Sequence, residues 1–142
     1  MKLYLAGPLF SAAERSWNAE LTAALRGAGH EVFLPQENEP GKDPPGIFST
    51  DVGGIDWADA LVAIMDGSDP DSGTAWEVGY AFGKKPIVLV RTDFRTQTGS
   101  GAPYNPMLTE SATTRLDLPF APMARVIAEV LGALARLDGV PR

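Results

Sequence analysis

The stretch ALVAIMDGSDPDSGTAWEVGYAFG, residues 60–83, decides the fold class. Its first six residues, Ala60 to Met65, are all apolar, which is typical of a central parallel strand covered on both faces. A turn-rich segment follows, and Asp71 or Ser72 can cap a helix that we expect to run to about Phe82. A buried strand that leads through a loop into a helix predicts a parallel α/β sheet with right-handed crossovers.

The sequence before this stretch shows the same alternation. Residues 2–6 and 30–34 are apolar runs that end at Gly-Pro and at Pro, and both are predicted to be strands. The helix between them should begin at a capping box formed by Ser11 and Glu14 and end near Arg26.

The sequence after this stretch completes the pattern. Strands are expected at residues 86–90 and near 112–116, and residues 92–111 are expected to be a loop. Residues 35–46 are also expected to be a loop because they hold four prolines, and 47–57 a short helix. The last helix is predicted by an apolar stripe at helical spacing that comprises Met123, Val126, Ile127, Val130, Leu131 and Leu134.

Five strands alternating with helices predict one α/β domain over residues 1–142. The expected architecture is a flavodoxin-like three-layer sandwich, with a parallel sheet in the order 2-1-3-4-5 and helices on both faces. Ligands of such sheets bind beyond the carboxyl ends of the strands. The loops at 7–10, 35–46, 66–72 and 92–111 should open at that edge.

Composition excludes several kinds of site. The 142 residues include no cysteine and one histidine, His30, so disulfides, thiolate metal sites and cysteine nucleophiles are excluded. A net charge of −6 argues against binding to nucleic acid or to an anionic membrane.

The opening MKLYLAGPLFSAA imitates a signal peptide, but Gly7 and Pro8 interrupt its apolar part, and it also fits a buried strand ended by a turn. We expect a soluble cytoplasmic protein. The phosphate-binding pattern G-x-x-x-x-G-K-[ST] and the dinucleotide pattern G-x-G-x-x-G are both absent.

Carboxylates dominate the polar groups expected at the carboxyl edge. Glu77 lies in the second turn of the helix after residues 60–65, and Asp51 comes from the segment before them. Each could be an ordinary surface acid. Tyr4, on the first strand, would need a partner for its buried hydroxyl, and a carboxylate at this edge could supply it. Gly79 and Gly83 suggest a helix face that allows close packing. Several acids with few bases suit glycosyl chemistry on a neutral sugar, which requires no metal and no organic cofactor.

Five segments of the chain resemble the nucleoside 2-deoxyribosyltransferase family. They are LYLAGPLF from residue 3, DVGGI from residue 51, ADALV from residue 58, GTAWEVGYA from residue 73 and NPM from residue 105. The block around the glutamate, with the aspartates before it, is the most specific of them. The resemblance implies a flavodoxin-like fold and an enzyme of nucleotide salvage that transfers 2-deoxyribose between nucleobases.

The resemblance also implies a role for individual residues. Glu77 matches the family's nucleophile, and Tyr4 matches the tyrosine that orients it. Asp51 matches the acid/base that protonates the departing base. Asp71 matches the ligand of the sugar 5′-hydroxyl, and Asn105 matches an asparagine lent to a neighbouring subunit's site. The resemblance therefore implies a homo-oligomer, at least a dimer with shared sites, and the family often forms hexamers built as trimers of dimers.

The residues that contact the base are less well defined by the resemblance. Phe10, Gln36 and Trp57 are candidates for stacking or edge contacts, and Gly7 for a backbone contact with the substrate. The expected partners are a 2′-deoxynucleoside and a free nucleobase. Glu77 is expected to be ionised, helped by its helix and by the tyrosine hydroxyl, while the acid/base aspartate is expected to be protonated.

Two alternatives remain open from the sequence. A related 2′-deoxynucleoside 5′-monophosphate N-glycosidase carries serine where Asp71 stands, and Ser72 is only one residue away. The other alternative is a flavodoxin-like binding module without catalysis.

Overall fold

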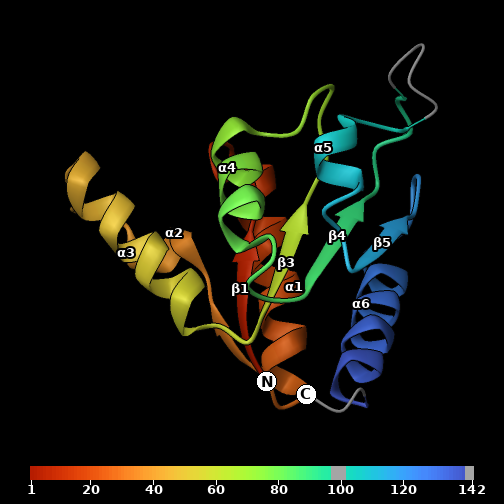
Figure 1. Cartoon of the computed structure of the whole chain (residues 1–142), viewed down its shortest axis with the longest axis horizontal. Coiled ribbons are helices and arrows are strands. Elements are labelled where there is room, and N and C mark those ends of the chain that lie inside the picture. The colour runs from red at the N-terminus through yellow and green to blue at the C-terminus, as the bar shows by residue number, and fades with distance from the viewer. Residues whose placement is uncertain (97–101, 140–142) are drawn as a thin grey trace.

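The computed structural model describes residues 1–96 and 102–139. It contains one parallel sheet in the order β2-β1-β3-β4-β5 (Figure 1). The five strands are β1 (Lys2–Ala6), β2 (Glu31–Phe33), β3 (Ala60–Ile64), β4 (Ile87–Arg91) and β5 (Thr114–Asp117). The predicted α/β class and strand order are therefore confirmed.

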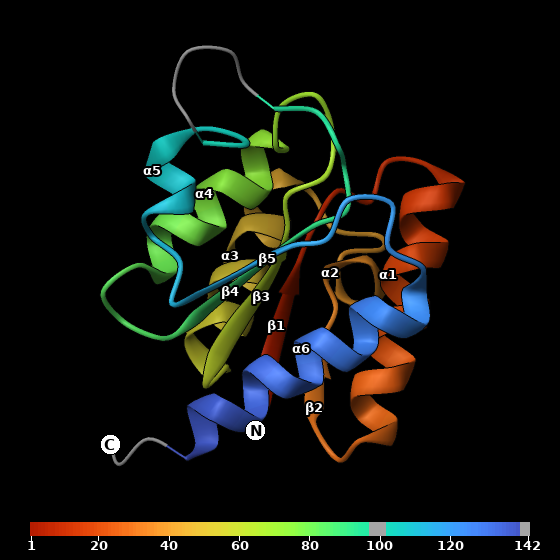
Figure 2. The same ribbon diagram turned by 90° about the vertical axis from the view of Figure 1, so that its right-hand side faces the viewer.

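Helices cover both faces of the sheet. α1 (Ala12–Gly27) and α6 (Met123–Asp138) lie on one side in Figure 2, opposite α3 (Pro44–Trp57), α4 (Ser72–Ala81) and α5 (Pro106–Thr109). Alternate strand residues feed two separate cores because successive side chains point to opposite faces. Leu3 and Leu5 belong to the core under α1 and α6, whereas Tyr4 and Ala6 belong to the core under the other three helices.

The capping box predicted for α1 is present. The Ser11 hydroxyl accepts a hydrogen bond from the Glu14 amide at 3.1 Å, and the Glu14 carboxylate accepts one from the Ser11 amide at 2.8 Å. The loop between β1 and α1 is thereby held at the carboxyl edge of the sheet.

Helix was underpredicted in the proline-rich loops. Residues 35–46 contain the short helix α2 (Pro35–Asn38), and α3 begins at Pro44 because Asp43 caps it. The loop at 92–111 contains α5, capped by Asn105. In each case proline occupies the first helical turn, where its missing N–H has no helical partner to lose. Glu39, which follows α2, and Asp51, on α3, reach the edge where the candidate site lies.

The predicted small-residue face on α4 is wrong for Gly83. α4 ends at Ala81, and Gly83 has a φ of 75°, so it forms the left-handed turn that leads to β4. Gly79 is in the helix, and a Cβ added there would meet no atom of the described chain within 4 Å.

Gly54→Ala is expected to destabilise the protein by about 1–3 kcal/mol, the usual cost of overpacking. A Cβ at Gly54 would lie 2.8 Å from ring atoms of Phe33. Phe33 stacks on Tyr4 with ring centroids 5.3 Å apart, so its ring has little room to retreat. Gly53→Ala is the matched control, because a Cβ there meets no described atom within 4 Å. Urea unfolding of both variants checks this, and equal stabilities would show that Phe33 yields freely.

Among residues 1–96 and 102–139, no helix is both long enough and apolar enough to cross a lipid bilayer.

Candidate active site

Two cavities meet at the carboxyl edge of the sheet and share Asp51 and Glu77 in their walls. The Asp71 cavity has a volume of about 280 Å³. It is lined by Gly7, Leu9, Phe10, Pro35, Glu39, Ile47, Asp51, Asp71, Gly73, Thr74 and Glu77. The Trp76 cavity has a volume of about 410 Å³. Its lining comprises Pro44, Ile47, Phe48, Asp51, Gly73, Trp76 and Glu77.

Tyr4 holds the carboxyl group of Glu77. The tyrosine side chain is completely buried at the centre of β1, and its hydroxyl donates a 2.6 Å hydrogen bond to Glu77 Oε1. The buried hydroxyl has thus found the carboxylate partner that the sequence predicted. Burial and the nearby carboxylates raise the pKa of Tyr4 far above its ordinary value, so it remains a donor. The contact fixes one oxygen of Glu77 and leaves the carboxyl group facing the two cavities.

Glu77 itself is harder to ionise than the sequence suggested. Burial raises its pKa to about 8, and the hydrogen bond from Tyr4 only partly opposes this rise. The negative charges of Asp51, Asp71 and Glu39 raise the pKa further. Burial thus opposes the expected ionisation of Glu77 in the free chain, because desolvation outweighs the hydroxyl donor.

Asp51 lies opposite, on α3. Its pKa is raised to about 7, chiefly by burial and then by a hydrogen bond and the charge of Glu39, while the charge of Lys42 lowers it. Oδ1 of Asp51 is buried and receives no hydrogen bond from an N–H or hydroxyl group of the described residues. The site thus contains two carboxyl groups that both titrate near neutrality, and their environments differ.

Asp71 combines a structural contact with a place in the cavity wall. It caps α4, and its Oδ2 accepts hydrogen bonds from the amide and hydroxyl of Thr74 at 2.9 and 3.1 Å. These contacts leave its other oxygen, Oδ1, outside the cap. Ser72 is exposed and lines neither cavity, so the aspartate is the residue presented to a ligand at this position.

The remaining predicted residues fall into two groups. Gly7 and Phe10 line the Asp71 cavity, and Phe10 is 76% exposed. Gln36 lines neither cavity, because its amide group donates to the Arg15 carbonyl at 2.9 Å and accepts from Asn18 at 3.2 Å.

Trp57 does not belong with the other predicted residues. It ends α3 just before β3, at the amino edge of the sheet, and Lys2 Nζ lies 5.3 Å from its ring centroid. Its assignment to this chain's base site is wrong, since Glu77 lies at the opposite edge.

Asn105 caps α5 through a 3.0 Å hydrogen bond from the Met107 amide, and it lines neither cavity of its own chain.

Several cavity residues were not predicted from the sequence, and three of them have side chains suited to contact or charge a ligand: Phe48, Trp76 and Glu39. Phe48 lies three residues before Asp51 on one face of α3, and Trp76 directly precedes Glu77. Their rings pack with centroids 5.4 Å apart in the wall of the Trp76 cavity. The i, i+3 spacing could have indicated Phe48. Glu39 lay in a stretch that we expected to be a plain loop.

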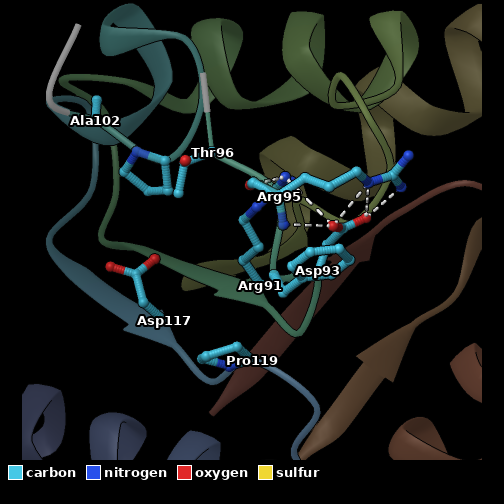
Figure 3. Close-up of a pocket in the computed structure, with 9 residues that line it drawn as sticks. Arg91, Asp93, Arg95, Thr96, Ala102, Asp117 and Pro119 are labelled. Atoms are coloured by element: carbon cyan, nitrogen blue, oxygen red, sulfur yellow. Dashed lines mark hydrogen bonds and ion pairs between the residues drawn. The ribbon is translucent and has the colours of Figure 1, made fainter. Parts of the chain in front are cut away.

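A third cavity, of about 360 Å³, lies beside the end of β4 and contains none of the predicted residues (Figure 3). Arg91 is 2% exposed there, and its guanidinium donates hydrogen bonds to the carbonyls of Met65, Gly67 and Arg95. Asp93 forms an ion pair with Arg95 next to it. These contacts tie the loop between β3 and α4 to the loop after β4, so we assign this cluster a structural role.

No group of three or more His, Asp or Glu side chains within 1–96 and 102–139 is arranged to hold a metal ion. The titratable side chains that both cavities share are two carboxyl groups. One is anchored by a tyrosine on the sheet, and the other faces it from α3.

Glu77→Gln is expected to remove a loss of stability that the native chain suffers as the pH rises. The folded-state pKa of about 8 exceeds the ordinary value of 4.5, so the neutral carboxyl favours folding. That contribution is complete below pH 4.5 and is lost as the pH rises through about 8. Since one pKa unit is worth about 1.4 kcal/mol, the variant should gain up to a few kcal/mol over the native chain at high pH. Urea unfolding of both proteins at about pH 5 and pH 9 tests this. If the free energy of unfolding changed with pH by the same amount in the native chain and in the variant, the prediction would be contradicted.

Comparisons with known proteins identify the family of this chain and relatives of solved structure. The family described as nucleoside 2-deoxyribosyltransferase matches residues 3–114. A solved 2-deoxyribosyltransferase from Bacillus psychrosaccharolyticus is 29% identical, with 89% of this chain and 90% of that chain covered and a TM-score of 0.71. Another, from Leishmania mexicana, is 25% identical, with coverages of 89% and 97% and a TM-score of 0.69.

A more distant structure, a CMP N-glycosidase from Clostridium botulinum, shares the fold at 17% identity, with coverages of 92% and 98% and a TM-score of 0.68. No curated protein matches the sequence significantly. The family match spans the first strand, both cavity carboxyl groups and the helix that carries Glu77. The chain therefore belongs to the nucleoside 2-deoxyribosyltransferase family.

Proposed function

We propose that this protein exchanges the base of a 2′-deoxynucleoside for another nucleobase, through a covalent 2-deoxyribosyl intermediate on Glu77. The single observation that carries the proposal is the pair of carboxyl groups that line both cavities. Glu77 is held by the Tyr4 hydroxyl at 2.6 Å, and Asp51 is held in a partly buried position opposite.

In the first half-reaction, the Glu77 carboxylate attacks C1′ and forms a bond between its oxygen and that carbon. The bond from C1′ to the base nitrogen breaks, and its electron pair goes to the base. Asp51 donates its proton to the departing base and becomes a carboxylate. In the second half, a nitrogen of the incoming base attacks C1′, Asp51 accepts the proton, and Glu77 leaves. Two inversions give net retention at C1′.

The two raised pKa values determine how much of the protein is in the reactive protonation state. The reaction needs one proton on the pair, located on Asp51, while Glu77 is ionised. With pKa values of about 7 for Asp51 and about 8 for Glu77, the pair carries a single proton in a narrow pH range between them. In that range the proton resides mainly on Glu77, whose pKa is higher, so the reactive arrangement, with the proton on Asp51, is the minor one. Because the groups interact, the two steps belong to the pair. A plot of the rate of base exchange against pH should therefore be a narrow bell with its maximum in that range.

Asp71 supports a nucleoside rather than a nucleotide as substrate. Its carboxylate lines the cavity, whereas Ser72 is exposed outside it. A carboxylate can accept a hydrogen bond from a sugar 5′-hydroxyl. Against a phosphate it would cost about 4 kcal/mol per pair of unit charges at ~4 Å.

We propose further that the working site is completed by a second copy of the chain. Asn105 caps the short helix α5, and Met107 lies on that helix and is 82% exposed. The open, largely apolar Trp76 cavity, whose wall contains Phe48 and Trp76, is the place on this chain that such a segment would fit.

The test is a panel of donors and acceptors. Deoxyinosine, thymidine and deoxycytidine are each incubated with adenine, cytosine or hypoxanthine, and deoxyinosine 5′-monophosphate is included with and without adenine. We expect new 2′-deoxynucleosides from the unphosphorylated donors. Hydrolysis of the monophosphate without base exchange would overturn the proposal in favour of an N-glycosidase.

A further inference from the structure

Glu39 is a third carboxyl group at the site and has no part in the mechanism above. It follows α2, and its amide donates to the Pro35 carbonyl at 2.9 Å, which holds the residue in place. Its side chain is half-buried and lines the Asp71 cavity together with Asp51 and Glu77. Three carboxyl groups thus share one cavity wall, where like charges oppose the ionisation of all three at once.

Glu39 and Asp51 stand in the wall of the same cavity. A hydrogen bond with Glu39, and after it the charge of Glu39, raises the pKa of Asp51. Two ionised carboxylates offer only acceptor oxygens, so a hydrogen bond between them requires a proton on one of the pair. No N–H or hydroxyl group of the described residues donates to the buried Oδ1 of Asp51, so nothing else in its surroundings replaces that proton.

The other charged groups around Asp51 do not supply a competing partner. Lys42 acts on it through charge, and its ammonium donates a 2.6 Å hydrogen bond to Thr50. Glu77 faces Asp51 from α4, but Oε1 of Glu77 accepts a hydrogen bond from the Tyr4 hydroxyl. Asp71 faces the same cavity, with one oxygen engaged in the cap of α4. Among these groups, Glu39 is the one that raises the pKa of Asp51 through a hydrogen bond as well as through its charge.

We propose that Glu39 is a positioning residue for the catalytic proton: its carboxylate accepts a hydrogen bond from protonated Asp51 and keeps there the proton that the departing base takes up. This inference rests on the proposed function. After the base has left with that proton, two carboxylates face each other. Their repulsion makes Asp51 a stronger base, so it readily takes a proton from the incoming base in the second half-reaction. Atoms and charges balance, because one proton leaves Asp51 and one returns.

Glu39→Gln tests the proposal, and Glu37→Gln is its matched control. Glu37 lies two residues earlier and is exposed, and it forms an ion pair with Arg26 at 2.7 Å, away from both cavities. The first readout needs no activity: the titration of the Asp51 carboxyl carbon by NMR in the full-length protein. Its pKa of about 7 should fall by about one unit in Glu39→Gln, a tenfold change in proton affinity, and stay unchanged in Glu37→Gln. An unchanged pKa in Glu39→Gln would overturn the proposal.

The second readout is base exchange with two donors. Deoxyinosine needs a proton on its leaving base, whereas 7-methyl-2′-deoxyguanosine has a cationic base that leaves without one. Glu39→Gln should lower the rate with deoxyinosine by about tenfold or more at slightly alkaline pH, in line with the loss of a general acid's proton. The rate with the methylated donor should change far less. An equal fall with both donors would indicate a merely structural role and overturn the inference.

The two readouts separate failure of this inference from failure of the proposed function. A native chain that exchanges no base overturns the function, while the NMR titration still decides whether Glu39 and Asp51 share the proton. A native chain that exchanges bases, with both readouts unmoved in Glu39→Gln, leaves the function standing and removes Glu39 from the mechanism.

Discussion

Glu77→Ala is expected to abolish base exchange, with a fall in kcat of about 10³–10⁶-fold, the range seen when a covalent nucleophile is removed. The reason is that the variant lacks the carboxylate proposed to attack C1′, the one that the Tyr4 hydroxyl holds at 2.6 Å. Binding of the donor should weaken far less than turnover, because the walls formed by Asp51, Asp71 and Phe48 remain. Chromatography of the bases and nucleosides after incubation gives the rate.

The matched control for this prediction is Glu20→Ala. Glu20 is exposed on α1, under the opposite face of the sheet, so its removal should leave the rate unchanged. The native protein, quenched during turnover, should carry the mass of one 2-deoxyribosyl group on the peptide that contains Glu77. Base exchange at the native rate in Glu77→Ala, or a sugar found on another residue, would contradict the double displacement.

The fold was largely predictable because local and global signals coincide in this chain. The apolar run that forms β3 has no alternative to burial on both faces, and Ser11 with Glu14 marks the start of α1 directly. The short helices α2 and α5 were missed because proline at a helix start has the same sequence signature as proline in a loop. Gly83 was placed on a helix face for a related reason, because spacing alone does not show where α4 ends.

The site was predictable only in part, for a physical reason that differs from residue to residue. The contact between Tyr4 and Glu77 could be expected because a buried hydroxyl needs a partner. The position of Trp57 could not, since an aromatic residue before a strand gives no sign of which edge of the sheet it occupies. Nor could the ionisation of Glu77, because its pKa depends on burial and on Glu39, which reaches the cavity only once α2 has formed.

Asp51→Asn should lower base exchange with ordinary donors by about 10²–10⁴-fold, the usual contribution of a general acid and base. An amide carries no transferable proton of suitable acidity, so the departing base must leave as an anion. The pH profile should change as well. In the native protein the rate falls on the alkaline side as Asp51, with a pKa of about 7, loses its proton. It falls on the acid side as Glu77, with a pKa of about 8, gains one.

In Asp51→Asn the alkaline limb should therefore vanish. The acid limb should move to lower pH, because the charge of Asp51 contributes to the raised pKa of Glu77 and the amide does not. Asp56→Asn, on the same helix and in contact with the Tyr80 hydroxyl at 3.1 Å, is the control and should keep both limbs. A profile that keeps its alkaline limb without Asp51 would assign that limb to another group. An unchanged rate with deoxyinosine would remove Asp51 from the chemistry, since no other step of the exchange supplies the base with its proton.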